Sequence, residues 1–105
     1  MASIRVYYGK EHGLKGRCRM NFNWPPINRH STVIITAGEA TDAAQQVFEF
    51  KTAFVFLLGS ADVYVTNVSP HDGGVEFILH VNWPNPLNVV VDITVLEPAQ
   101  QVVRV

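Results

Sequence analysis

Residues 75–83 read Val-Glu-Phe-Ile-Leu-His-Val-Asn-Trp, and apolar side chains occupy every second position from Val75 to Trp83. A period of two predicts a β-strand with one buried face, because successive side chains of a strand point to opposite faces. The same alternation recurs along the chain, and no segment sustains the period of an amphipathic helix. Strands are expected near residues 3–8, 17–24, 31–37, 46–51, 53–58, 61–68, 75–83 and 88–96, with a short further one at 101–105.

Turn-forming residues separate these segments. Gly9 to Gly16 is a polar loop, Gly59-Ser60 is a tight connection, and residues 69–74 read Ser-Pro-His-Asp-Gly-Gly. Each is expected to join antiparallel neighbours. About eight short strands predict an all-β fold, a two-sheet antiparallel β-sandwich that is Ig-like or jelly-roll. Residues 53–58 are apolar on both faces, which predicts a central strand or one covered by a partner subunit.

Length and composition predict a single domain over residues 1–105. Hydrophobic residues make up 48% of the chain and charged residues 16%, as in a globular protein. The longest apolar run, Ala53 to Leu58, is far shorter than the roughly 20 residues that span a bilayer. The alternating start does not resemble a signal peptide, which predicts a cytoplasmic location. Cys18 is the only cysteine, so no disulfide within the chain is expected.

Both tryptophans lie in a repeated sequence. Residues 20–28 read Met-Asn-Phe-Asn-Trp-Pro-Pro-Ile-Asn, and residues 79–88 read Leu-His-Val-Asn-Trp-Pro-Asn-Pro-Leu-Asn. With Asn85 treated as an insertion, the Asn, Trp, Pro, Pro and Asn positions are identical. The prolines force the chain out of its strand, and the closing Asn suits a left-handed turn that bonds its own backbone. The repeat predicts two copies of one hairpin, each with a corner.

Two interpretations of these corners follow. In the favoured one, Trp24 and Trp83 each plug one end of the core, since the alternating apolar residues before them share their face. In the other, the paired corners form one ligand platform, because flat apolar rings beside amides suit sugar rings and peptides. The candidate ligand-binding residues are Asn23, Trp24, Asn28, Asn82, Trp83 and Asn88.

The sequence gives little support for a reactive thiol, a metal site or an enzyme active site. Cys18 shares a face with Met20 and Phe22, which predicts a buried, inert thiol. The histidines lack metal-ligand spacing, and no nucleotide-binding or nucleophile motif occurs, so neither a metal, a cofactor nor an enzyme activity is expected. A hairpin at the second corner would place His80 opposite Asp92.

Charge is unevenly distributed along the chain. Residues 1–30 carry six of the eight Lys and Arg residues and one acid, Glu11. Lys15, Arg17 and Arg19 are the candidate basic face, and with the other bases and nearby aromatics they could contact single-stranded nucleic acid. The net charge of −1 disfavours that partner.

These observations predict a non-catalytic binding module with a glycan or peptide ligand. The alternative is a structural or assembly subunit that acts through homo-oligomerisation, since residues 53–58 and the low charge favour self-association. A single-stranded nucleic-acid binder or an enzyme ranks lower.

Overall fold

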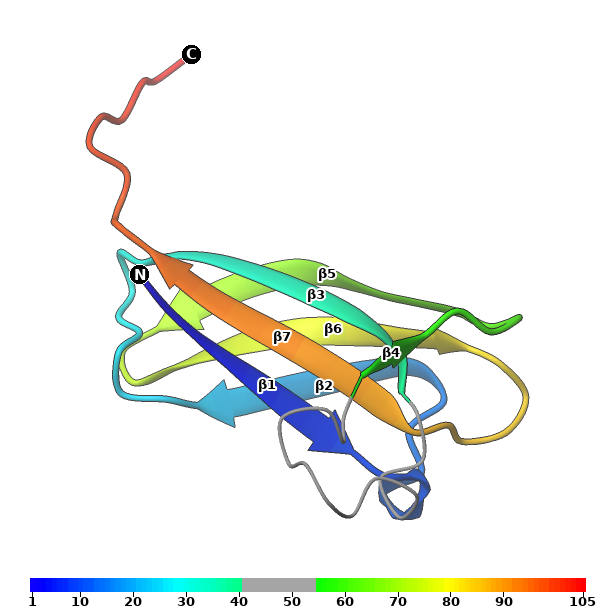
Figure 1. The fold of residues 1–105 in the computed structure, drawn as a ribbon. Coiled ribbons are helices and arrows are strands. Elements are labelled where there is room, and N and C mark those ends of the chain that lie inside the picture. Colours follow the sequence, from blue (N-terminus) through cyan, green and yellow to red (C-terminus); the bar gives the residue numbers. More distant parts are fainter. Residues whose placement is uncertain (41–54) are drawn as a thin grey trace.

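The computed structural model describes residues 1–40 and 55–105, which form an all-β sandwich (Figure 1). The predicted strand at 46–51 and the first residues of 53–58 lie outside the described residues. The described elements are β1 (Ala2–Tyr8), the short 3-10 helix η1 (Lys10–His12), β2 (Gly16–Asn23), β3 (Thr32–Ala40), β4 (Phe56–Leu57), β5 (Asp62–His71), β6 (Gly74–Asn82) and β7 (Val89–Leu96).

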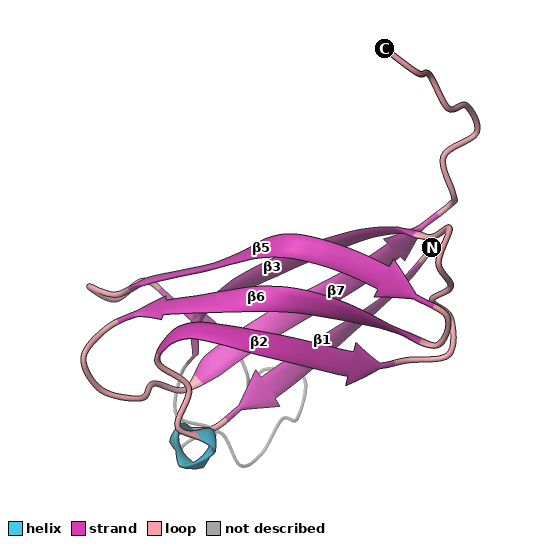
Figure 2. Cartoon of the chain, turned by 180° about the vertical axis from the view of Figure 1, so that it is seen from behind, coloured by secondary structure: helices cyan, strands magenta, loops and turns pink. Residues whose placement is uncertain are grey.

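The strands form two antiparallel layers (Figure 2). Sheet A has the order β1-β7-β3-β4, and sheet B has the order β2-β6-β5. The two-sheet antiparallel sandwich predicted from the sequence is confirmed. Its strand order is not that of an immunoglobulin domain, in which the first two strands share a sheet. Here β1, β2 and β3 alternate between the sheets, as successive strands of a jelly roll do.

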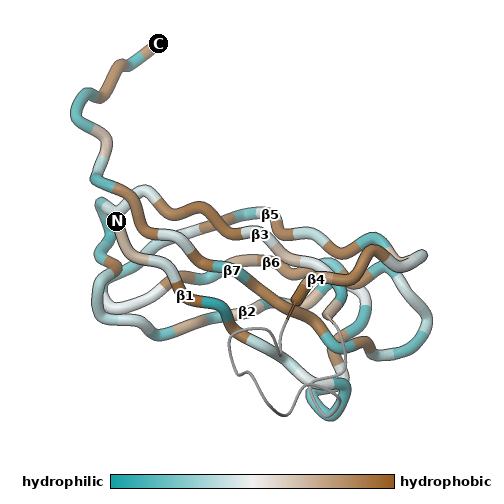
Figure 3. Tube along the Cα trace, viewed as in Figure 1, coloured by the Kyte–Doolittle hydropathy of each residue, from teal (hydrophilic) through white to brown (hydrophobic). Residues whose placement is uncertain are grey.

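The core lies between β6, the central strand of sheet B, and β7, which pairs along its whole length with β1 and β3 in sheet A. Phe77, Leu79 and Val81 of β6 face Val91 and Ile93 of β7, and all five are at most 1% exposed. Both strands are largely apolar along the chain trace (Figure 3), since Ile78 and Val90 on their other faces are also buried. Burying each such side chain contributes roughly 1.5–3 kcal/mol, which makes this pair of strands the centre of stability.

The repeated corners are not hairpins. Each one carries the chain from sheet B to sheet A, the first between β2 and β3 and the second between β6 and β7. β2 pairs with β6 and β3 pairs with β7, both antiparallel, so a pseudo-two-fold axis relates the two strand-corner-strand units. The prolines account for the crossing, because a residue without an N–H cannot continue the ladder into an adjacent strand.

Two of the three connectors also differ from the prediction. The loop from Gly9 to Gly16 and the Gly59-Ser60 connection cross between sheets, whereas a two-residue turn, Asp72-Gly73, joins β5 to β6 as expected. Gly73 has a φ of 88°, a conformation that favours glycine. Local turn chemistry specifies a reversal but not the sheet that receives the next strand.

The apolar run and the C-terminal segment differ from the predictions as well. β4 is a two-residue edge strand of sheet A, and Leu58 beyond it is fully exposed, so the described part of the run is not a central strand. Residues 101–105 form no strand, and the segment after Pro98 projects away from the sandwich (Figure 1). Composition cannot separate two-sided burial from exposure at an edge.

Candidate functional site

The two corners lie at opposite ends of the sandwich. β2 and β6 are antiparallel, so Asn23 at the end of β2 pairs with Gly74, whereas Val81 near the end of β6 pairs with Gly16. Trp24 and Trp83 follow these two strand ends. A single platform that combines both corners of one chain is therefore wrong, because the antiparallel pairing separates them by the length of the sheet.

The two tryptophans differ in their environments. Trp24 is half-buried and packs against the core, and its backbone N–H donates to the Gly73 carbonyl. Trp83 is 39% exposed and is absent from the core cluster of described residues. The plug interpretation therefore holds in part for Trp24 and is wrong for Trp83.

In each corner an aliphatic residue packs at the end of the core, where tryptophan was expected. Ile27 is 1% exposed and belongs to the core, and the corresponding Leu87 packs against it. The repeated sequence marks these two core residues, because both copies place a branched apolar residue immediately before the closing Asn.

The closing asparagines hold the corners in shape. The Asn28 side-chain oxygen accepts from the His30 N–H at 2.8 Å, and the Asn88 side-chain oxygen accepts from the Lys10 N–H at 2.8 Å. Asn28 therefore bonds its own corner as predicted. Neither residue is left-handed, since Asn67 is the only non-glycine described residue with a positive φ.

The first corner is bound to the β5–β6 turn. Gly73 donates its N–H to the Ile27 carbonyl, and the Arg29 guanidinium lies 2.7 Å from the Asp72 carboxylate. The side-chain and backbone hydrogen bonds from Arg29 lower the pKa of Asp72 to about 2. On β2, the Asn23 side-chain oxygen accepts from the Asn21 amide. These contacts give the first corner a structural role.

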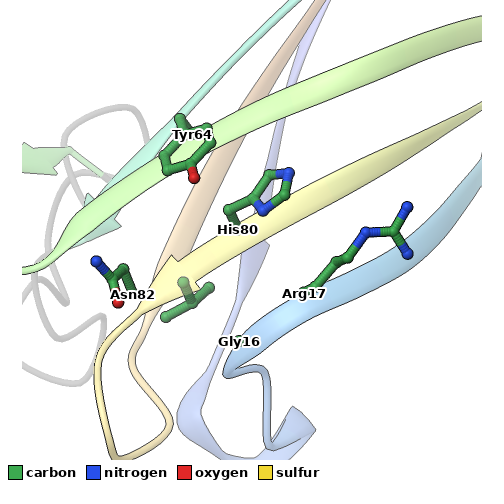
Figure 4. A pocket seen from close by; sticks show the side chains of 6 residues that line it. Gly16, Arg17, Tyr64, His80 and Asn82 are labelled. Carbon is green, nitrogen blue, oxygen red and sulfur yellow. The ribbon is translucent and has the colours of Figure 1, made fainter.

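The second corner lies beside a pocket on the outer face of sheet B. Asn82 precedes Trp83 directly and lines this open cavity of about 300 Å³ (Figure 4). Arg17, His80 and Tyr64 lie side by side across β2, β6 and β5, because they are cross-strand partners in the two ladders. The pocket is lined by Gly16, Arg17, Tyr64, His80, Val81 and Asn82.

His80 organises the centre of this pocket. Its ring stacks on Tyr64 with centroids 4.5 Å apart and an interplanar angle of 10°. Its Nε2 lies 2.8 Å from the Thr66 hydroxyl, a group that can donate or accept. Tyr64 is 48% exposed despite this stacking, so one side of its ring packs against His80 while much of the side chain meets solvent.

The expected His80–Asp92 pair is wrong. His80 belongs to sheet B, whereas Asp92 lies in sheet A and accepts from Arg5 at 2.8 Å. The error follows from the hairpin expected at the second corner. Tyr64 is not among the residues predicted from the sequence, where its one signal is its place at a polar position of an alternating strand.

The basic residues of the first 30 positions do not form one face. Arg5 lies on sheet A, and Arg29 lies in the first corner, whereas Arg17 and Arg19 lie on β2 in sheet B. Of the candidate basic face, Arg17 and Arg19 share the outer side of β2, and Lys15 is an exposed residue just before that strand. Arg19 is paired with Glu76 at 2.9 Å.

Cys18 lies on the core side of β2, as alternation predicted, but it is half-buried rather than buried, and its thiol donates to the Lys15 carbonyl 3.3 Å away. In the part of the chain that the structure describes, no group of three or more His, Cys, Asp or Glu residues could hold a metal ion. Among those same residues, no helix is long and apolar enough to cross a membrane. Comparison of the chain with protein families, with curated proteins and with solved structures gives no match.

Proposed function

We propose that this domain is a non-catalytic binding module that takes a saccharide in the pocket formed by Arg17, Tyr64, His80 and Asn82. The observation that carries the proposal is the half-exposed Tyr64 ring, held by stacking on His80 beside an exposed amide. Sugar rings bind through apolar C–H faces that lie on aromatic rings and through hydroxyls that bond amides and charged groups.

The order of the site supports binding without a change in shape. Tyr64 and His80 are on neighbouring strands of a regular ladder, and Thr66 holds the imidazole from the same face. A pre-ordered ring loses little side-chain entropy when a ligand covers it. Trp83 follows Asn82 directly in the chain and is 39% exposed, which makes its ring the candidate for a second aromatic contact.

The shape of the pocket favours a saccharide over a peptide strand. A peptide that adds to a sheet needs a free strand edge, whereas Tyr64, His80 and Arg17 project from the face of sheet B. The pocket is open on that face, which suits one or two rings of a longer glycan, and its lining side chains come from three neighbouring strands (Figure 4).

The test is a glycan array followed by titration calorimetry with the best oligosaccharide. Tyr64→Ala removes the ring that would lie under the sugar, and we expect affinity to fall at least about tenfold, equivalent to about 1.4 kcal/mol. Asn21→Ala, on the same outer face but four residues further along β2 than Arg17, is the matched control and should bind like the parent. Parent-like binding by Tyr64→Ala would place the ligand elsewhere.

A second candidate function, assembly through homo-oligomerisation, is favoured by the exposed apolar surface. Phe56, Leu57 and Leu58 are exposed at the edge of sheet A, and Val102 and Val103 are exposed in the projecting segment. Exposed apolar side chains at a sheet edge favour association, because a second chain can cover them and remove them from water.

Light scattering tests this candidate. We expect a particle of at least twice 11.7 kDa at high protein concentration, and a shift toward 11.7 kDa when Leu57 and Leu58 are replaced by Ser. Thr36→Ser, on the same sheet, should leave the mass of the particle unchanged. A parent mass near 11.7 kDa at every concentration would exclude assembly.

A further inference from the structure

The arginines of the sandwich differ in their partners. Arg5 pairs with Asp92 at 2.8 Å, Arg19 with Glu76 at 2.9 Å and Arg29 with Asp72 at 2.7 Å. Within residues 1–40 and 55–105, Arg17 has no carboxylate at ion-pair distance, although it is an exposed strand residue like Arg19. Arg17 is also the arginine that lines the Tyr64–His80 pocket.

His80 adds a second donor on the same side. Its Nε2 is engaged by the Thr66 hydroxyl, and its ring lies between Tyr64 and Arg17 (Figure 4). When the hydroxyl donates to Nε2, the neutral imidazole carries its proton on Nδ1. Nδ1 then offers an N–H for which the described residues provide no side-chain partner.

The charges around the pocket are arranged in two groups. Arg17 carries the positive charge of the pocket lining, and Lys15 is an exposed residue two positions before it in the chain. Asp62 is the cross-strand partner of Asn82, so it lies one row beyond Tyr64, His80 and Arg17 and on β5, the strand furthest from Arg17 in sheet B. The Arg17 side of the pocket is therefore positive, and the Asn82 side carries an amide and a carboxylate.

We propose that the ligand is an acidic oligosaccharide: the Arg17 guanidinium binds a carboxylate on one sugar unit, while another unit lies on the face of Tyr64 that His80 leaves exposed. Arginine suits this role because its planar fork donates two parallel hydrogen bonds to a carboxylate. In the tautomer in which Thr66 donates to Nε2, the His80 Nδ1–H supplies a further donor beside the stacked ring. This inference rests on the proposed saccharide-binding function and names the class of sugar.

The experiment compares three oligosaccharides of equal length, one with uronic acid units, one neutral and one sulfated but free of carboxylate. Titration calorimetry on the parent protein should show the uronic acid form binding at least about tenfold more tightly than the neutral form, and more tightly than the sulfated form. Arg17→Gln should remove this preference, so that the variant binds the uronic acid form no more tightly than the neutral form. Raised salt should weaken only the charged ligands.

The control is Arg29→Gln, which removes the same charge from the opposite end of the sandwich and should leave the affinity for all three sugars unchanged. Equal affinity for neutral and uronic acid forms, or parent-like binding by Arg17→Gln, would overturn the acidic-ligand inference and leave saccharide binding standing. Preference for the sulfated form would overturn the carboxylate assignment. Failure to bind any saccharide would overturn both this inference and the proposed function.

Discussion

Replacing Ile27 by Ala is expected to lower the free energy of unfolding by about 2–5 kcal/mol. Ile27 is 1% exposed and packs in the core cluster at the first corner, so its loss removes apolar contacts and leaves a cavity. The cavity would not close easily, because Ile27 is fixed on both sides by backbone hydrogen bonds, from its N–H to Trp24 and from Gly73 to its carbonyl. The free energy of unfolding of a small domain is only about 5–15 kcal/mol, so this loss is a large fraction of the total stability.

Urea unfolding followed by circular dichroism measures this loss. Leu87→Ala is the matched variant, since Leu87 occupies the equivalent place in the second corner but is only half-buried. We expect its loss of stability to be smaller than that of Ile27→Ala. A melting temperature of Ile27→Ala within about 2 °C of the parent would show that Ile27 does not close the core.

Replacing Trp24 by Ala is expected to cost about 3 kcal/mol, near the lower limit for buried aromatic residues, because the ring is only half-buried against the core. Trp83→Ala should cost about 1 kcal/mol or less, because Trp83 is 39% exposed and packs outside the core cluster. The pseudo-symmetric corners therefore have unequal effects on stability.

Thermal melts of the two single variants distinguish the corners. Each variant keeps one tryptophan, so intrinsic fluorescence also reports where the remaining ring lies, with Trp83 emission expected to be the more solvent-exposed. Equal losses of stability would contradict the asymmetry seen in the structure. Saccharide titration of Trp83→Ala then shows whether its ring contributes to the rim of the pocket.

Much of the local structure follows from neighbouring residues alone. The alternation in residues 75–83 predicts a strand that buries Phe77, Leu79 and Val81, and all three are buried. The Asp72-Gly73 turn and the repeated Asn-Trp-Pro corners are also read directly from the chain. These features are local because strand periodicity and turn formation depend on residues close together in sequence.

The sequence predicts the candidate site less completely than it predicts the strands. Asn82, Trp83 and Arg17 were selected for their residue types, and the fold brings them to one end of sheet B. Asn28 and Asn88, selected for the same reason, use their side chains to hold backbone N–H groups. Residue type cannot separate an amide that binds a ligand from one that completes a turn.

By itself, the sequence determined the all-β class, most of the described strands and the buried face of the strands in the core, because these depend on period and composition. Only the tertiary structure decided that the corners cross between sheets and lie at opposite ends, that Trp83 is exposed, and that Tyr64, His80 and Arg17 meet in one row. That row joins residues far apart in the chain, and cross-strand register depends on the packing of both sheets together rather than on any local pattern.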